Sequence, residues 1–132
     1  MSTESSTELI AVDTGIWIEG LLYGGPAEEL VKMAVSQSIK LMTCESMLLE
    51  LSQVLQDGLG FSPAGAREVC RFVRDCAIVV KDDEGPASGP FDPRASLLRM
   101  SVANGATAIA ATEHSRLLRL DQHEEIPIVS IM

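Results

Sequence analysis

Short apolar runs alternate along the chain with longer segments in which apolar residues recur every three or four positions. The short runs predict strands at residues 8–12, 39–42, 77–80, 106–111 and 126–131. The periodic segments predict helices at residues 16–23, 26–38, 43–56, 63–75, 93–103 and 115–120. Segment 81–90 holds three acids, two glycines and two prolines, and so predicts a loop.

Cap and breaker residues set the expected helix boundaries. Gly24 and Gly25 end the first helix, while Pro26, Pro63 and Pro93 stand where a helix begins and needs no backbone N–H from its first residue. We expect N-caps at Thr43 and Ser62. The apolar faces that we expect to lie inside are Leu30, Val31, Ala34 and Val35; Met47, Leu48, Leu51, Val54 and Leu55; Val69, Phe72 and Val73; and Leu97, Leu98 and Val102.

The alternation of strands and helices predicts an α/β fold with a central parallel sheet and helices on both faces. Several strands are continuous apolar runs, as expected when both faces of the sheet are covered. Ligands of such sheets bind beyond the carboxyl ends of the strands. Asp13 follows one predicted strand, and Thr112, Glu113 and His114 follow another.

Composition predicts one globular domain at residues 8–132, after a flexible Ser/Thr-rich leader at residues 1–7. Hydrophobic residues make up 46% of the chain but aromatic residues only 4%, so the core must be aliphatic. No run is long enough to span a membrane, and the leader lacks the features of a signal peptide. Three cysteines without a CxxC pair suit a reduced protein, and we expect a cytoplasmic location.

The net charge of −9 argues against a protein that coats nucleic acid by charge alone. The charge is uneven, because residues 1–60 hold nine acids and two lysines, whereas residues 61–132 hold ten acids and eight bases. Any bound polyanion must therefore be held mainly by the second half of the chain.

Three segments together resemble the PIN-domain nucleases of the toxin–antitoxin (VapC-like) type. The first is IAVDTGIWIEGLLYGGPAEEL at 10–30, similar to the family's opening strand, Asp-Thr turn and Gly-Gly-Pro break, although Gly15 replaces the usual Asn. The second is TCESMLLELSQVL at 43–55. The third is the order Asn104-Gly105-Ala106, Thr112, Leu117-Leu118 and IPIVS at 126–130. The resemblance spans nearly the whole chain and implies a PIN-like three-layer fold.

The resemblance also implies a metal-dependent ribonuclease. PIN domains hold Mg²⁺ or Mn²⁺ with clustered acids, because these hard cations prefer oxygen ligands and activate water for attack on an RNA phosphodiester. Asp13 matches the first family acid and Glu50 the second. A pair of aspartates should open the helix near Pro93, but those positions are taken by Pro93, Arg94 or Ala95, and the nearby carboxylate is Asp92. The last acid corresponds to Glu113 or His114.

Each candidate also has a simpler structural interpretation. Asp13 and Asp92 are both well placed to be helix N-caps, and Glu50 could lie on a solvated helix face. Glu113 and His114 could be ordinary loop residues, and the acidic run from Asp82 to Glu84 is interpreted as a solvated loop. Arg94, His114 and Arg116 are the candidate phosphate-binding residues, or else ordinary surface groups.

Two hypotheses follow. The first is an active PIN-type ribonuclease with Asp13, Glu50, Asp92 and Glu113 as catalytic and metal-binding residues. The second is a catalytically degenerate PIN domain that serves as a binding or regulatory module, since loss of the metal would allow Arg and Ala at 94–95. The partners implied are RNA, a possible antitoxin protein and a second copy of the chain, with no membrane.

Overall fold

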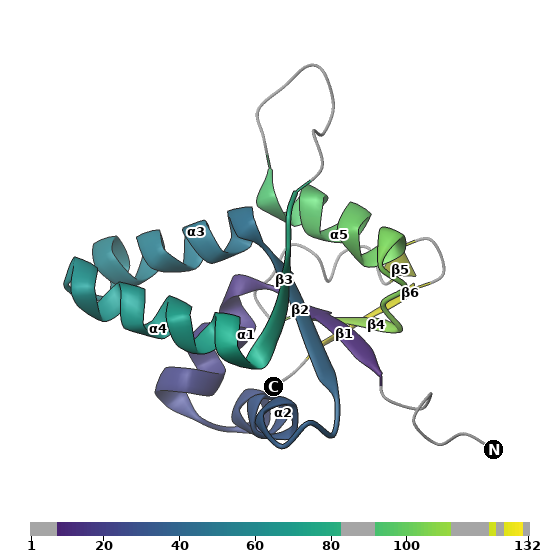
Figure 1. Ribbon diagram of the computed structural model, residues 1–132, viewed down its shortest axis with the longest axis horizontal. Coiled ribbons are helices and arrows are strands. Elements are labelled where there is room, and N and C mark those ends of the chain that lie inside the picture. Colours follow the sequence, from purple (N-terminus) through teal and green to yellow (C-terminus); the bar gives the residue numbers. More distant parts are fainter. Residues whose placement is uncertain (1–7, 83–91, 112–121, 124–125, 131–132) are drawn as a thin grey trace.

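The computed structural model, which describes residues 8–82, 92–111, 122–123 and 126–130, is built on a sheet with strand order β3-β2-β1-β4-β6-β5 (Figure 1). The strands are β1 Leu9–Val12, β2 Lys40–Cys44, β3 Ala77–Val80, β4 Ala108–Ala111, β5 Gln122–His123 and β6 Ile126–Ser130. All neighbours from β3 to β6 pair in parallel, and the two-residue β5 pairs antiparallel to β6. The predicted α/β class with a parallel central sheet is confirmed.

The described helices lie where the sequence predicts them, with ends that differ from the predicted ones by up to three residues, and two of them continue as π-helical turns. They are α1 Thr14–Ile18, continued by η2 Glu19–Tyr23; α2 Pro26–Val35; α3 Glu45–Gln53, continued by η3 Val54–Gly58; α4 Pro63–Cys76; and α5 Pro93–Ala103. Gly24 and Gly25 have φ of 88° and 78°, which disfavours side chains with a Cβ and ends η2. Pro26, Pro63 and Pro93 each open a helix, and Ser62 Oγ caps α4 by accepting from Gly65 N.

Two largely aliphatic cores lie on opposite faces of the sheet, because alternate strand residues point to opposite sides. One core joins Val12, Leu41 and Ala110 of the strands to Ile16 and Trp17 of α1 and to buried residues of α2, α3 and α4. The other joins Ala11, Met42 and Ile109 to Leu97 of α5 and to Met47 at the start of α3. Helix α5 therefore covers one face of the sheet, and the remaining helices cover the other. Helices α3 and α4 lie side by side (Figure 1).

The predicted N-cap at Thr43 is wrong. Strand β2 continues to Cys44 because Thr43 and Cys44 still pair with Val79 and Val80 of β3. Helix α3 begins at Glu45, and the side chain of its N-cap residue, Cys44, makes no capping hydrogen bond.

Three residues expected inside are partly exposed instead: Val35, Phe72 and Val102. Each lies near the boundary of its helix's apolar face, and the side chain of an adjacent residue in the helix is buried instead. The predicted helix at 115–120 lies outside the described residues. None of the described helices is long and apolar enough to cross a bilayer.

Candidate functional site

The turn from β1 into α1 brings Asp13 and Thr14 to the carboxyl end of the central strand. Asp13 is 1% exposed, and its Oδ1 accepts a hydrogen bond of 3.2 Å from the backbone N–H of Ile16. Asp13 is therefore the N-cap of α1, as one of the two interpretations of the sequence predicts. Its predicted role as a metal ligand stays a prediction.

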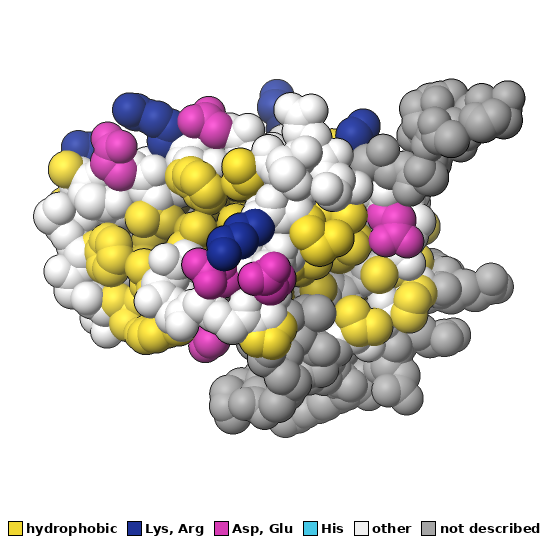
Figure 2. All heavy atoms as spheres, turned by 90° about the horizontal axis from the view of Figure 1, so that it is seen from below, with side chains coloured by type: hydrophobic (Ala, Val, Ile, Leu, Met, Phe, Trp, Pro, Cys, Tyr) yellow, Lys and Arg dark blue, Asp and Glu magenta, His cyan; other side chains and the backbone are white. Residues whose placement is uncertain are grey.

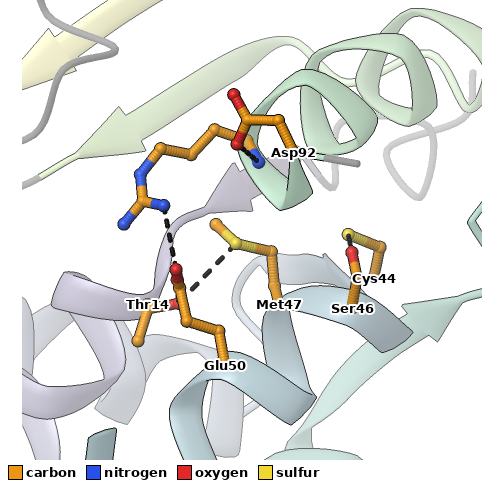
Figure 3. Close-up of polar contacts among 7 residues, drawn as sticks. Thr14, Cys44, Ser46, Met47, Glu50 and Asp92 are labelled. Carbon is orange, nitrogen blue, oxygen red and sulfur yellow. Dashed lines mark hydrogen bonds and ion pairs between the residues drawn. The ribbon is translucent and has the colours of Figure 1, made fainter. Parts of the chain in front are cut away.

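Glu50 of α3 meets this turn through its side chain (Figure 3). Thr14 Oγ1 donates a hydrogen bond of 2.6 Å to Glu50 Oε1, and it also lies 3.6 Å from the sulfur of Met47. The side chain of Glu50 is only 24% exposed, so it does not lie on a freely solvated helix face. The structure thus brings Glu50 to the residue that follows Asp13. This contact lies at the carboxyl ends of the strands, where ligands of parallel sheets bind.

Arg94 reaches the same carboxylate from the first turn of α5. Its Nη1 donates to Glu50 Oε2 at 3.0 Å, and both side chains are 24% exposed. This ion pair joins α3 to α5 through two residues that lie 44 positions apart in the sequence. Partial burial reduces solvent screening, so this ion pair contributes more than a fully exposed one.

Asp92 helps to set the position of Arg94. Asp92 Oδ1 accepts a hydrogen bond of 3.1 Å from the backbone N–H of Arg94, which makes Asp92 the N-cap of α5 (Figure 3). The capping role that its place before Pro93 predicts is confirmed. The same carboxylate fixes the start of the helix from which the Arg94 side chain extends.

These groups do not fit a Mg²⁺ or Mn²⁺ ion in the arrangement observed. Each carboxylate oxygen of Glu50 already accepts from a protein donor, and one of these donors is a guanidinium that stays charged at any physiological pH. An ion beside Glu50 would have to displace Arg94. Within the described ranges, no three His, Cys, Asp or Glu side chains form a group that could hold a metal ion. Glu113, His114 and Arg116 lie outside those ranges.

The interpretation of the acidic run 82–84 as a solvated loop is wrong for Asp82, whose side chain is hydrogen-bonded to two helices, while residues 83 and 84 lie outside the described ranges. Asp82 accepts hydrogen bonds from the Ser46 backbone N–H at 2.8 Å, from the Ser46 hydroxyl at 2.5 Å, and from the hydroxyl of Ser96. Ser96 is fully buried. Asp82 thereby supplies the cap that α3 lacks from its own N-cap residue, and it ties β3, α3 and α5 together.

The hydrogen bonds of Asp82 also change its acidity. Burial alone raises the pKa of this carboxyl, but the hydrogen bonds donated by Ser46 and Ser96 outweigh burial and hold the pKa below its ordinary value. No pattern in the sequence singles out Asp82 within its acidic run, since its partners lie 36 and 14 positions away.

A groove of about 720 Å³ lies between α3 and α4, next to Asp82. Three arginines of α4 spaced along one helix face, Arg67, Arg71 and Arg74, line it together with Ser46, Ser52 and the exposed Leu49. Arg74 is held by Glu45 through two contacts of 2.7 and 3.1 Å. Arg71 lies 3.6 Å from Glu68 in an exposed pair, and Arg67 forms no ion pair with any described residue.

No protein-family model matches this sequence, and no curated protein matches it either.

Proposed function

We propose that this chain is a PIN-like domain in which Arg94 takes the place of a divalent cation, and that it is an RNA-binding module without metal-dependent nuclease activity. The observation that carries the proposal is the Arg94–Glu50 contact of 3.0 Å. A guanidinium neutralises a carboxylate as a metal would, but it offers no coordination site at which a water could be activated.

The chain departs at the start of α5 from the family that it resembles. Where that family has carboxylates at the start of this helix, the chain has Arg94 and Ala95, and the carboxylate beside them, Asp92, caps the helix. Two of the expected ligands, Asp13 and Asp92, thus accept backbone hydrogen bonds from helix N-termini. The nuclease hypothesis stays a prediction that the experiment below decides.

The α3–α4 groove supports RNA as the partner. It is lined by three arginines and two acids, Glu45 and Asp82, and so carries more positive than negative charge in a protein of net charge −9. Arginines beside hydroxyl and apolar side chains suit a single-stranded nucleic acid, whose phosphates pair with guanidinium groups while its bases stack or pack.

The three cysteines are free thiols, which supports the proposed cytoplasmic location.

Binding of a fluorescent single-stranded RNA, measured by anisotropy, tests the proposal. We expect the same Kd in EDTA and in Mn²⁺, and an intact RNA after incubation with Mn²⁺. The double variant Arg67→Ala/Arg71→Ala should bind more weakly and lower the dependence of log K on log salt by about 1.4, because each lost phosphate contact on a single strand contributes about 0.7.

Lys32→Ala is the matched control, since Lys32 is an exposed cation on α2 and does not line the groove. RNA cleavage that requires Mn²⁺ and is abolished by Glu50→Gln would contradict the proposal and establish the nuclease. Absence of RNA binding by the wild type would also contradict it and leave a protein as the partner.

A further inference from the structure

The three arginines that line the α3–α4 groove differ in what they contact. Arg67, Arg71 and Arg74 follow one another at steps of about 6 and 4.5 Å along the axis of α4. Arg71 has one exposed contact of 3.6 Å with Glu68. Arg74 is held at both terminal nitrogens, because Nη2 donates to Glu45 Oε1 at 2.7 Å and Nη1 donates to Glu45 Oε2 at 3.1 Å. One end of the row of arginines is therefore already neutralised.

The Arg74–Glu45 contact has the geometry of a strong surface ion pair. Two N–H···O bonds between one guanidinium and one carboxylate fix the orientation of both groups, and such bidentate pairs contribute more than ordinary exposed ones. The hydrogen bonds from Arg74 hold the pKa of the Glu45 carboxyl below its ordinary value, so Glu45 is ionised at neutral pH. The side chains of Arg74 and Glu45 are 51% and 42% exposed, so a ligand in the groove can reach the pair.

The other acid of the groove, Asp82, is engaged elsewhere. It accepts from Ser46 and Ser96, and within the described residues it forms no ion pair with an arginine. Glu45 is therefore the carboxylate that a phosphate has to displace in order to reach Arg74. Carboxylate and phosphate both offer a guanidinium two acceptor oxygens, so they compete for the same donors.

We propose that Glu45 occupies the place of a third phosphate in this groove, and thereby limits the wild type to the two phosphates of a single-stranded RNA that Arg67 and Arg71 bind. This role rests on the proposed RNA binding and defines its footprint. A third phosphate at Arg74 gains one contact but leaves Glu45 unpaired beside a polyanion, and this repulsion offsets the gain. Glu45 is thus a specificity-determining residue, because it sets how many phosphates the row of arginines can hold.

Salt titrations of RNA binding test this role with two variants that fold by circular dichroism. Anisotropy of a fluorescent oligouridylate gives the Kd at each salt concentration. Glu45→Gln frees Arg74, and should lower the Kd by about fivefold and steepen the dependence of log K on log salt by about 0.7, the contribution of one further phosphate. Glu45→Gln/Arg74→Ala removes both partners of the ion pair and should return both quantities to their wild-type values.

Glu29→Gln is the matched control, because it makes the same change in net charge away from the groove. Glu29 is an exposed residue of α2 and does not line the groove. On the α2 side of the molecule, charged side chains are scattered between hydrophobic patches, and the described residues form no continuous basic surface there (Figure 2). Glu29→Gln should therefore leave the Kd and the salt dependence unchanged.

A Glu45→Gln variant with the salt dependence of the wild type, or one that binds no better than Glu29→Gln, would overturn the role of Glu45 and leave RNA binding intact. A double variant with a weaker salt dependence than the wild type would also overturn it, because Arg74 would then already hold a phosphate. RNA binding by Glu45→Gln but not by the wild type would support this role and contradict the proposed function. Absence of binding by both would overturn both.

Discussion

Arg94→Asp is expected to make the stability of the protein depend on divalent cations. Without metal the change replaces an attraction to Glu50 by repulsion between two partly buried carboxylates, and should lower the free energy of unfolding by about 2–4 kcal/mol. Addition of Mn²⁺ should restore stability, because the new carboxylate and Glu50 can share the ion. At a concentration 100 times its Kd, a ligand adds about 2.7 kcal/mol.

Three companion variants make this experiment specific. Arg94→Gln should be destabilised but insensitive to Mn²⁺, since it offers no new carboxylate, and Lys32→Asp should show neither effect. Adding Asp13→Asn to Arg94→Asp distinguishes a capping role of Asp13 from a role as a metal ligand. Asn caps a helix as well as Asp does, but it is a poorer metal ligand. Thermal melts that show no response of Arg94→Asp to Mn²⁺ would count against a latent metal site.

Asp82→Ala is expected to give the second large effect, a loss of about 3 kcal/mol in the free energy of unfolding. The change removes three hydrogen bonds to one carboxylate and leaves the hydroxyl of the fully buried Ser96 without this acceptor. It also removes the cap of α3. Urea unfolding measures the loss. The control is Asp57→Ala, because Asp57 is a carboxylate in η3 for which no hydrogen bond or ion pair is observed. A loss of less than about 0.5 kcal/mol would contradict the role of Asp82.

The contribution of Asp82 has a predictable pH dependence. Its pKa is lower in the folded protein than the ordinary value of 3.8, despite the opposing effect of burial, because Ser46 and Ser96 donate to the ionised form. The stabilisation is therefore fully present above pH 3.8 and is lost as the pH falls through the lower, folded pKa. The stability difference between wild type and Asp82→Asn should be constant near neutral pH and shrink in acid below that value.

The pattern of the sequence predicts the fold well because the relevant signals are local. Continuous apolar runs predict the buried parallel strands, and Pro26, Pro63 and Pro93 predict three helix starts to the residue. The error at Thr43 has a tertiary cause, since pairing with β3 extends β2 through a residue that could equally have capped a helix. Likewise, the exposure of Val35 and Phe72 is set by how neighbouring elements pack.

The candidate site is predicted only in part. Asp13, Asp92 and Glu50 were found from strand ends, cap positions and family resemblance, and Arg94 was recognised as the unusual residue among them. The sequence offers Arg94 as a phosphate-binding residue or an ordinary surface group, whereas the structure pairs it with Glu50. Asp82 was missed because its partners, Ser46 and Ser96, come from two helices that are distant in sequence.

The claim that Arg94 stands where a cation would bind is tested most directly by a crystal structure of the wild type grown with MnCl₂, with anomalous data collected at the manganese edge. If Arg94 replaces the cation, its Nη1 contacts Glu50 in this structure and no anomalous peak lies within ligand distance of Glu50. A manganese peak about 2.0–2.6 Å from a Glu50 oxygen, with the Arg94 side chain turned away, would contradict the account.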